Sequence, residues 1–192
     1  MKILCAGEML ADILVHPVER VKLQNETCQV REIRITHGGD ANNNAVDLVK
    51  LGHQVIYLGR VGCDDMGDYV LSLAKKAGIC MDHAVRSDTA AQAKSLILIS
   101  PDGDRTFLQE LGTSAEFCFE DCDLSLLDEA DLLQIGGAFH LPRFDGEGSA
   151  ALLKAARDRG VVTSMDVTSD RTGKWRGILD PCYPWLDYFL PS

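Results

Sequence analysis

The sequence predicts an α/β protein in which helices pack on both faces of a parallel β-sheet. One signature occurs three times, namely an amphipathic helical segment, then a glycine, then a short apolar run, at residues 45–59, 69–81 and 152–166. A helix that ends at glycine and leads into an apolar strand is typical of the βαβ units that build parallel sheets. Several short runs are also almost continuously apolar, as expected of strands that are buried on both faces.

Five of these apolar runs are the candidate strands of the parallel sheet. In chain order they are residues 3–6, 55–58, 132–135, 161–162 and 188–190. The second helical segment illustrates the pattern, because Val70, Leu73 and Ala74 fall on one helical face. Gly78 follows them at the position of a left-handed C-cap.

Two segments break this alternation of strands and helices. Within residues 12–39, Ile33 and Ile35 alternate with polar neighbours, and residues 93–111 hold a Pro-Asp-Gly turn at 101–103 between two extended runs. One-sided alternation is typical of strands with one solvated face. We therefore expect a small β-sheet whose strands are inserted at about residues 12–37 and 93–111. Two interpretations stay open, a lid over a binding site or a surface addition without such a role.

The composition excludes some classes of partner. At 192 residues the chain is long enough for one main domain, and its net charge of −10 argues against nucleic acids and anionic membranes, which bind basic surfaces. The seven cysteines form no CxxC pair and no metal-site spacing, so we expect mostly buried, reduced thiols and no bound metal. The apolar runs before Glu8 and at 96–99 are short, so we expect neither a signal peptide nor a membrane span and predict a cytoplasmic protein.

Residues 36–52, THGGDANNNAVDLVKLG, place a glycine pair and three asparagines at the start of a helical pattern. Asparagine is unfavourable inside a helix because its amide competes for backbone hydrogen bonds. A helix N-terminus, however, carries unpaired N–H donors and a partial positive charge, and short polar side chains there can cap the helix or bind a ligand. Either Asp40 is the N-cap and the asparagines face water, or the asparagines contact a polar ligand.

Asp12 is a second candidate for ligand binding. It follows closely on the first predicted strand, at the carboxyl end of the sheet, where open α/β sheets bind their ligands. An ionised carboxylate accepts hydrogen bonds at two oxygens, so it can bind adjacent hydroxyls of a polyol. A solvated aspartate at a strand exit is the alternative.

Taken together, these stretches resemble the ribokinase/PfkB family of carbohydrate kinases. The matching motifs are GEMLAD at 7–12, GGDANN at 38–43 entering a helix that ends in Leu-Gly, and GRVGCDDMG at 59–67. GDRTF at 103–107 and the DVTSDR…W segment at 166–175 also fall where the family has a lid hairpin turn and a strand-end Asp-x-Asn-x-x-Arg. The resemblance covers essentially the whole chain.

The resemblance implies a three-layer, Rossmann-like (ribokinase-like) α/β fold with a small β-sheet lid that often forms a homodimer contact. It implies an enzyme that transfers the γ-phosphoryl group of ATP, with Mg²⁺, to a hydroxymethyl group of a sugar or nucleoside. By this resemblance residues 1–192 form the N-terminal part of such a domain, which is incomplete at its C-terminus, and bind the sugar.

The resemblance also implies roles for single residues. Asp12 would accept hydrogen bonds from sugar hydroxyls, and Asn43 would form a hydrogen bond with a further hydroxyl. Gly38 and Gly39 would let the sugar lie against the backbone. Asp40 occupies a position that varies in the family and would tune the choice of sugar.

Three further side chains lie near these motifs, and we expect solvent contact or a ligand contact for them. Neighbouring residues on a helix diverge, so we expect Asn42 and Asn44 to point away from the site and to contact solvent only. Arg105 in the lid turn can reach an anionic substrate, although an exposed hairpin arginine is the simpler explanation. The five histidines have no metal-ligand spacing and are expected to be structural or solvated.

The chain also departs from the family pattern. The Gly-Ala-Gly-Asp-like segment, which in the family holds the transferring phosphate and supplies the catalytic aspartate, has no match here. Ser192 stands where the family's Asn-x-x-Glu motif would begin, and Thr168 replaces the asparagine of Asp-x-Asn. Thr113 and Ser114 replace an Ala-Asn pair. We therefore expect no catalytic residue and no nucleotide site within these 192 residues, and predict that this chain alone is inactive.

Three functions remain open on the sequence. The first is the substrate-binding portion of a kinase for a sugar or sugar acid. The second is the corresponding portion of a nucleoside kinase. The third is a truncated, non-catalytic module that binds a polyol or forms dimers through its lid strands.

Overall fold

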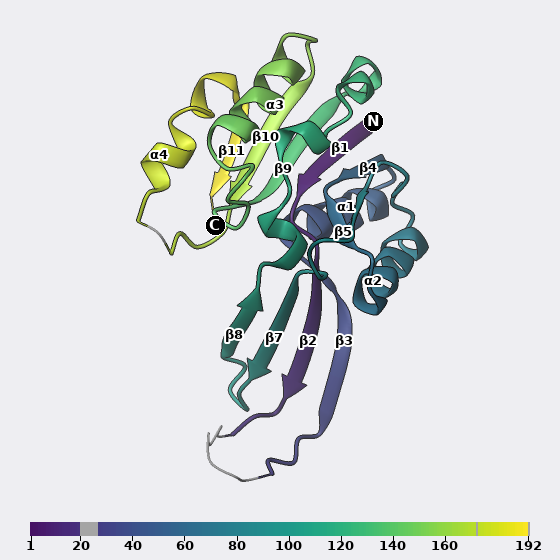
Figure 1. Ribbon diagram of the computed structural model, residues 1–192, viewed down its shortest axis with the longest axis vertical. Coiled ribbons are helices and arrows are strands. Elements are labelled where there is room, and N and C mark those ends of the chain that lie inside the picture. The colour runs from purple at the N-terminus through teal and green to yellow at the C-terminus, as the bar shows by residue number, and fades with distance from the viewer. Residues whose placement is uncertain (20–26, 172, 192) are drawn as a thin grey trace.

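The computed structural model describes residues 1–19, 27–171 and 173–191 and is built on one central parallel sheet (Figure 1). Its strand order is β11-β10-β9-β1-β4, and every neighbouring pair is parallel. Each strand overlaps one of the predicted apolar runs, so the predicted sheet is confirmed. The strands are β1 (Lys2–Gly7), β4 (Gln54–Leu58), β9 (Leu132–Ala138), β10 (Val162–Val167) and β11 (Tyr188–Pro191).

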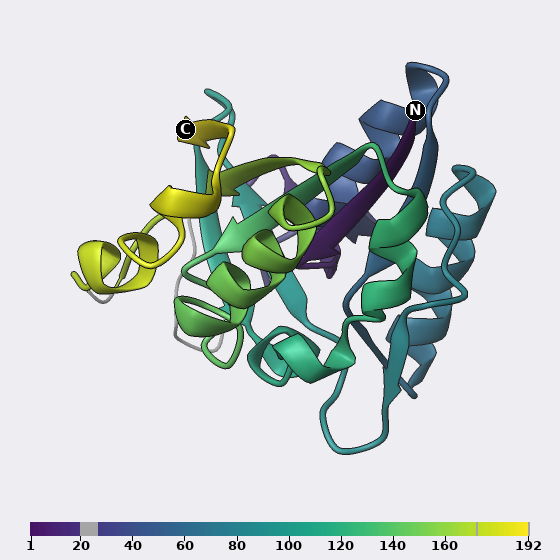
Figure 2. The same cartoon turned by 90° about the horizontal axis from the view of Figure 1, so that it is seen from above.

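Helices lie on both faces of this sheet, which gives the predicted three layers (Figure 2). Alternate residues of β1 point to opposite faces, as a strand requires. Ile3 packs with the helices α1 and α2, whereas Leu4 packs with the helix α3. The helices are α1 (Asp40–Lys50), α2 (Asp65–Lys76), α3 (Glu147–Arg157) and the short α4 (Trp175–Leu179).

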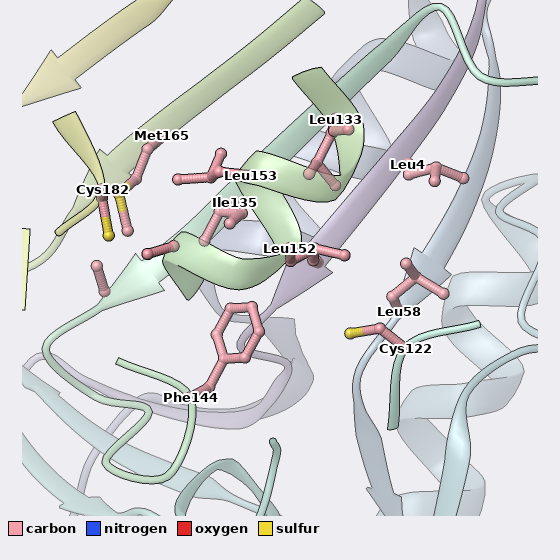
Figure 3. Close-up of a cluster of buried hydrophobic side chains, with 14 of the residues drawn as sticks. Leu4, Leu58, Cys122, Leu133, Ile135, Phe144, Leu152, Leu153, Met165 and Cys182 are labelled. Atoms are coloured by element: carbon pink, nitrogen blue, oxygen red, sulfur yellow. The ribbon is translucent and has the colours of Figure 1, made fainter. Parts of the chain in front are cut away.

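The core on the α3 side is tightly apolar (Figure 3). Leu152 and Leu153 of α3 pack against Leu133 and Ile135 of β9, and all four side chains are fully buried. Each such side chain contributes about 1.5–3 kcal/mol to stability through the area it removes from water. This core fixes the strand ends from which the candidate site is built.

A separate small sheet, with strand order β3-β2-β7-β8, projects from the carboxyl ends of the parallel strands (Figure 1). Its strands are β2 (Leu10–His16), β3 (Glu32–Gly38), β7 (Lys94–Ile99) and β8 (Arg105–Glu110). The predicted turn joins β7 to β8, where the Gly103 N–H donates to the Ser100 carbonyl at 3.0 Å. The small sheet is therefore confirmed; residues 20–26 of the first predicted insertion lie outside the described residues.

Short elements complete the chain. The GRVGCDDMG stretch forms the edge of a two-stranded sheet and the start of α2, and the Asp64 carboxylate caps that helix by accepting from the Gly67 N–H at 2.7 Å. The remaining elements are β5 (Arg60–Gly62), β6 (Val85–Ser87), and four 3₁₀ helices, η1 (Gly112–Ala115), η2 (Phe119–Asp121), η3 (Leu124–Glu129) and η4 (Tyr183–Trp185).

Four of the seven cysteines, namely Cys5, Cys118, Cys122 and Cys182, are buried, as the sequence predicts for most of them. Within the described part of the chain, every helix is too short or too polar to cross a membrane.

Candidate functional site

The carboxyl ends of the parallel strands and the inner face of the small sheet enclose a cavity of about 330 Å³. A cavity of this size lies at the lower end of the range of about 300–1,000 Å³ that is typical of small-molecule sites. Five of the six candidate binding residues line it, namely Asp12, Gly39, Asp40, Asn43 and Arg105. These residues come from β2, from the start of α1 and from β8, so the fold brings three separate parts of the chain together.

The floor of the cavity depends on glycines that allow backbone to touch backbone. Gly39 has φ +92°, and a Cβ there would lie 2.6 Å from the Glu8 carbonyl oxygen. A Cβ at Gly136, at the end of β9, would lie 2.5 Å from the backbone nitrogen of Ala41. Real Cβ atoms do not come so close to backbone, so only glycine allows α1 to begin directly against the ends of β1 and β9.

Gly38 is the candidate that does not line the cavity, and its contact explains its position. A Cβ on Gly38 would lie 1.9 Å from Oδ2 of Asp12. The Asp12 carboxylate therefore rests on the Cα of Gly38. Gly38 makes room for the Asp12 carboxylate, whereas the sequence analysis expected it to contact the sugar.

The inner face of the small sheet forms one wall of the cavity in ordered rows. The strand register aligns Asp12, Ser95 and Gln109 in the row nearest the parallel sheet. Phe107 belongs to the next row and Arg105 to the row beyond it. Because residues on one face of a strand are two apart, successive rows are separated by about 7 Å.

Asp12 and Asp40 are carboxylates held partly out of water. Burial, with a smaller contribution from the negative charge of Glu8, raises the pKa of Asp12 to about 6. Burial also raises the pKa of Asp40 to about 6, with Asp166 and Glu8 acting in the same direction. Oδ1 of Asp12 is buried and has no hydrogen-bond partner among the described residues. A carboxylate oxygen of this kind can accept a hydrogen bond from a ligand hydroxyl.

A network that the sequence did not predict closes the end of the cavity nearest the parallel sheet. Glu8 is only 3% exposed, and its Oε1 accepts from Nε2 of Gln109 at 3.0 Å. Nδ1 of His140 lies 3.3 Å from the same oxygen. Nε2 of His140 is buried without a partner within the described part of the chain. The network ties the small sheet to the parallel sheet.

The turn that carries His140 is strained. Phe139 has φ +81°, in the left-handed region that residues other than glycine rarely adopt. The Asp145 carboxylate holds this turn by accepting from the N–H groups of Phe139 and Leu141, each at 3.2 Å. Backbone strain of this kind clusters at binding sites, and here it accompanies a histidine that lines the cavity.

The three asparagines point in three directions, and the expectation for two of them is wrong. Asn43 is exposed and lines the cavity. Asn42 is fully buried, and its Oδ1 lies 3.1 Å from Nδ1 of His37. Asn44 donates to Oδ2 of Asp166 at 2.6 Å. Neighbouring helix residues do diverge, but the directions away from the cavity lead to β3 and β10 and not to solvent.

The segment after β10 adds a second group of residues to the cavity. Thr168, Ser169 and Arg171 line it, although only a strand-end motif marked them in the sequence. Thr113 and Ser114, which replace the Ala-Asn pair, are buried in η1. The position of Ser192 lies outside the described residues.

A second hollow, of about 560 Å³, lies between α1 and strands β9, β10 and β11. Exposed apolar side chains of Leu51, Tyr188 and Leu190 line it. Asp40 and Asn44 line it too, so it opens beside the first cavity on the other side of the start of α1.

Comparisons with known proteins bear on the whole chain. A family model described as pfkB family carbohydrate kinase matches residues 1–189. A probable fructokinase-5 from Arabidopsis thaliana is 26% identical over 162 residues, which are 83% of this chain and 48% of that protein. An ATP-dependent ribose-1-phosphate kinase from Halopiger xanaduensis is 25% identical over 166 residues, which are 86% of this chain and 54% of that protein.

A solved structure agrees with the fold. The fructokinase with bound ATP from Xylella fastidiosa has a TM-score of 0.78 at 23% identity, over 98% of this chain and 60% of that chain. The chain thus spans about half the length of the curated relatives named above. The likeness confirms the predicted α/β fold with its small sheet.

The glycine contacts predict that alanine substitution lowers stability by different amounts at two glycines that both have positive φ. Gly39→Ala should lower the free energy of unfolding by more than about 2 kcal/mol, because strain adds to a backbone clash. Gly52→Ala, where φ is +87° and the added Cβ meets open space, should cost only about 1 kcal/mol. Urea unfolding of the two variants measures both values. Equal losses would show that the contact of Gly39 with β1 is unimportant.

Because the pKa of Asp12 is raised, removing its charge should stabilise the protein by an amount that depends on pH. Folding penalises the ionised form, and the penalty grows as pH rises from about 4 through about 6 and is complete above that range. Asp12→Asn should therefore stabilise the protein at pH 8 by about 1–2 kcal/mol after allowance for partial exposure, or several degrees in Tm, and have no such effect below pH 4.

Thermal unfolding across this pH range measures the effect, with Asp47→Asn as the control because Asp47 is exposed on α1. A stability gain that is independent of pH, or that is equal in the control, would contradict the assignment.

Proposed function

This chain belongs to the pfkB family of carbohydrate kinases, and on that premise we propose that residues 1–192 form the sugar-binding part of an ATP-dependent kinase. The reaction proposed for the complete enzyme is transfer of the γ-phosphoryl group of ATP to a hydroxymethyl group of the sugar. Binding of the sugar by this part would supply the positioning on which phosphoryl transfer depends.

The observation that supports the proposal is the convergence of Asp12, Asn43 and His140 on one cavity beneath the small sheet. The three side chains offer an acceptor-only carboxylate, an amide with both donors and an acceptor, and an imidazole nitrogen. Two of the atoms, Oδ1 of Asp12 and Nε2 of His140, are buried without partners among the described residues. Hydroxyl groups both donate and accept, so a polyol is the ligand that satisfies this set.

The end of this cavity near the start of α1 does not fit the triphosphate of ATP. Glu8, Asp12 and Asp40 line it, and α1 presents the Asp40 carboxylate at its own N-terminus, where a phosphate would otherwise bind. In the parts of the chain that the structure describes, no group of three or more His, Cys, Asp or Glu side chains is placed to hold a metal ion. We therefore propose that the groups that bind ATP and Mg²⁺ lie in polypeptide outside these residues.

The second hollow supports the proposal that the nucleotide site lies in polypeptide outside these residues. Leu51, Tyr188 and Leu190 expose apolar surface in it, directly beside the candidate sugar cavity. The structural relatives contain polypeptide beyond the portion that matches this chain. Such polypeptide packed into the hollow would stand next to the bound sugar.

A nucleoside is the second candidate substrate, because the ring of Phe107 lines the cavity and is 45% exposed. An exposed aromatic ring in a cavity can stack on a base. A non-catalytic polyol-binding module remains the other alternative, and a turnover assay separates it from the complete kinase.

Calorimetric titration of the 192-residue chain with fructose, ribose and adenosine tests the proposal. At least one sugar should bind, and Asp12→Ala and Asn43→Ala should each weaken it by about tenfold or more, the effect of one hydrogen bond to a charged or desolvated group. Asp47→Ala, on the exposed face of α1, should leave binding unchanged.

The same samples with ATP and Mg²⁺ should release no ADP. Release of ADP in the presence of sugar would refute the proposal that the nucleotide site lies outside these residues. Unchanged affinity in both site variants would refute the assignment of the cavity as the sugar site.

We also propose a homodimer through the outer face of the small sheet. Ile33, Ile35 and Leu108 on that face are 63%, 38% and 57% exposed. The register places Ile35 and Leu108 in one apolar row that crosses all four strands. Contiguous exposed apolar surface of this kind marks interfaces.

Leu108→Asp should convert the dimer to a monomer, because a buried unpaired carboxylate is costly at an interface. Sedimentation measures the mass, with Leu51→Asp as the control because Leu51 is equally apolar and 73% exposed, away from the small sheet. A wild-type monomer at micromolar concentration, or dissociation by the control alone, would contradict the proposed dimer.

A further inference from the structure

The charged residues of the cavity are segregated along its length. Three carboxylates, from Glu8, Asp12 and Asp40, gather where the small sheet meets the parallel sheet. Two arginines, Arg105 and Arg171, line the same cavity from different elements, one at the start of β8 and the other in the loop after β10. Neither guanidinium forms an ion pair with any of the described residues. Two unpaired guanidinium groups in one cavity point to an anionic group on the ligand.

The strand register sets the distance between the two ends. Asp12 and Gln109 share the row nearest the parallel sheet, and Arg105 starts two rows further along β8. The Arg105 guanidinium, however, lies over the ring of Phe107, 5.6 Å from its centroid, in the row between them. The cation is thereby held about one row, or about 7 Å along the strand, from the row of Asp12. This separation is comparable with the length of an extended hexose chain.

The stacked position of Arg105 also favours binding. A guanidinium resting on an aromatic face keeps its donor edge free for a planar partner. Ordering the side chain before the ligand arrives reduces the conformational entropy lost on binding. Gln109, which shares this strand face, is fixed at the other end by its hydrogen bond to Glu8. The face of β8 thus sets the distance between Gln109, at the Asp12 end of the cavity, and the Arg105 guanidinium.

We propose that the substrate is an anionic sugar, whose carboxylate or phosphate binds Arg105 and Arg171 while its hydroxyls bind the Asp12 end of the cavity. This inference rests on the proposed function and narrows it to charged substrates. A neutral sugar of the same size would fill the Asp12 end and leave both guanidinium groups without a partner. The carboxylates near Asp12 repel an anion placed there, so they also fix the direction in which the substrate lies.

Calorimetric titration of the 192-residue chain with matched pairs of ligands tests this inference. The pairs are glucose with gluconate, and fructose with fructose 1-phosphate, so that the two arms distinguish a carboxylate from a phosphate. The anionic member of at least one pair should bind about tenfold or more tightly than its neutral partner, as expected for bidentate arginine contacts. Its affinity should also fall as salt is raised.

Arg105→Gln and Arg171→Gln should each remove most of this preference, because each should weaken the anionic ligand more than its neutral partner. Arg159→Gln is the control, because Arg159 pairs with Asp128 outside the cavity. Thermal unfolding of each variant shows whether it has folded. An anion preference that survives both cavity variants would overturn the inference.

The outcomes separate this inference from the proposed function. Equal binding of neutral and anionic sugars, lost in Asp12→Ala, would overturn the inference and leave the sugar-binding function standing. Binding of neither class would overturn both. Binding of fructose 1-phosphate and gluconate alike, with loss of both in the arginine variants, would support the shared anionic chemistry.

Discussion

Direct backbone contact between the end of β1, the end of β9 and the start of α1 is the constraint on which the candidate site depends. The Glu8 N–H donates to the Gly136 carbonyl at 3.1 Å, and the Asn42 N–H donates to the Glu8 carbonyl at 3.3 Å. Glycines at 39 and 136 remove the Cβ atoms that would hold these segments apart. Because α1 begins so close to the strand ends, its first exposed side chain, Asn43, shares a cavity with Asp12, which β2 carries.

That same closeness has an electrostatic cost. Glu8, Asp12 and Asp40 line one cavity, and desolvation raises the pKa of the latter two carboxyls. These buried and partly buried carboxylates, among which Oδ1 of Asp12 has no partner among the described residues, lower the stability of the empty protein. A bound polyol would return the hydrogen bonds that water supplies in the unfolded chain. The preformed site would thus lower the free energy of unfolding of the empty protein and raise its affinity for the ligand.

The layers of the fold follow from periodicity in the sequence, but the site follows only in part. Apolar runs and glycine-terminated helices identify all five parallel strands, because burial on two faces leaves a continuous local signal. Local motifs mark Asp12 and Asn43, which line the candidate cavity. Glu8 carried a readable signal, a charged residue directly after a buried strand, whereas His140 and Gln109 carried none. Both contact Glu8, which lies more than a hundred residues away in the chain, and each contacts the other across 31 residues, so only the folded chain shows these contacts. The error at Asn42 and Asn44 has the same origin, since their partners, His37 and Asp166, come from β3 and β10.

An NMR titration of the isotopically labelled 192-residue chain, with whichever sugar binds most tightly, tests the central claim most directly. If the glycine contacts assemble one site, the amide signals of Asp12, Asn43 and His140 should move together and report a single Kd. Signals that shift with different affinities, or shifts confined to the hollow beside β11, would contradict a shared cavity.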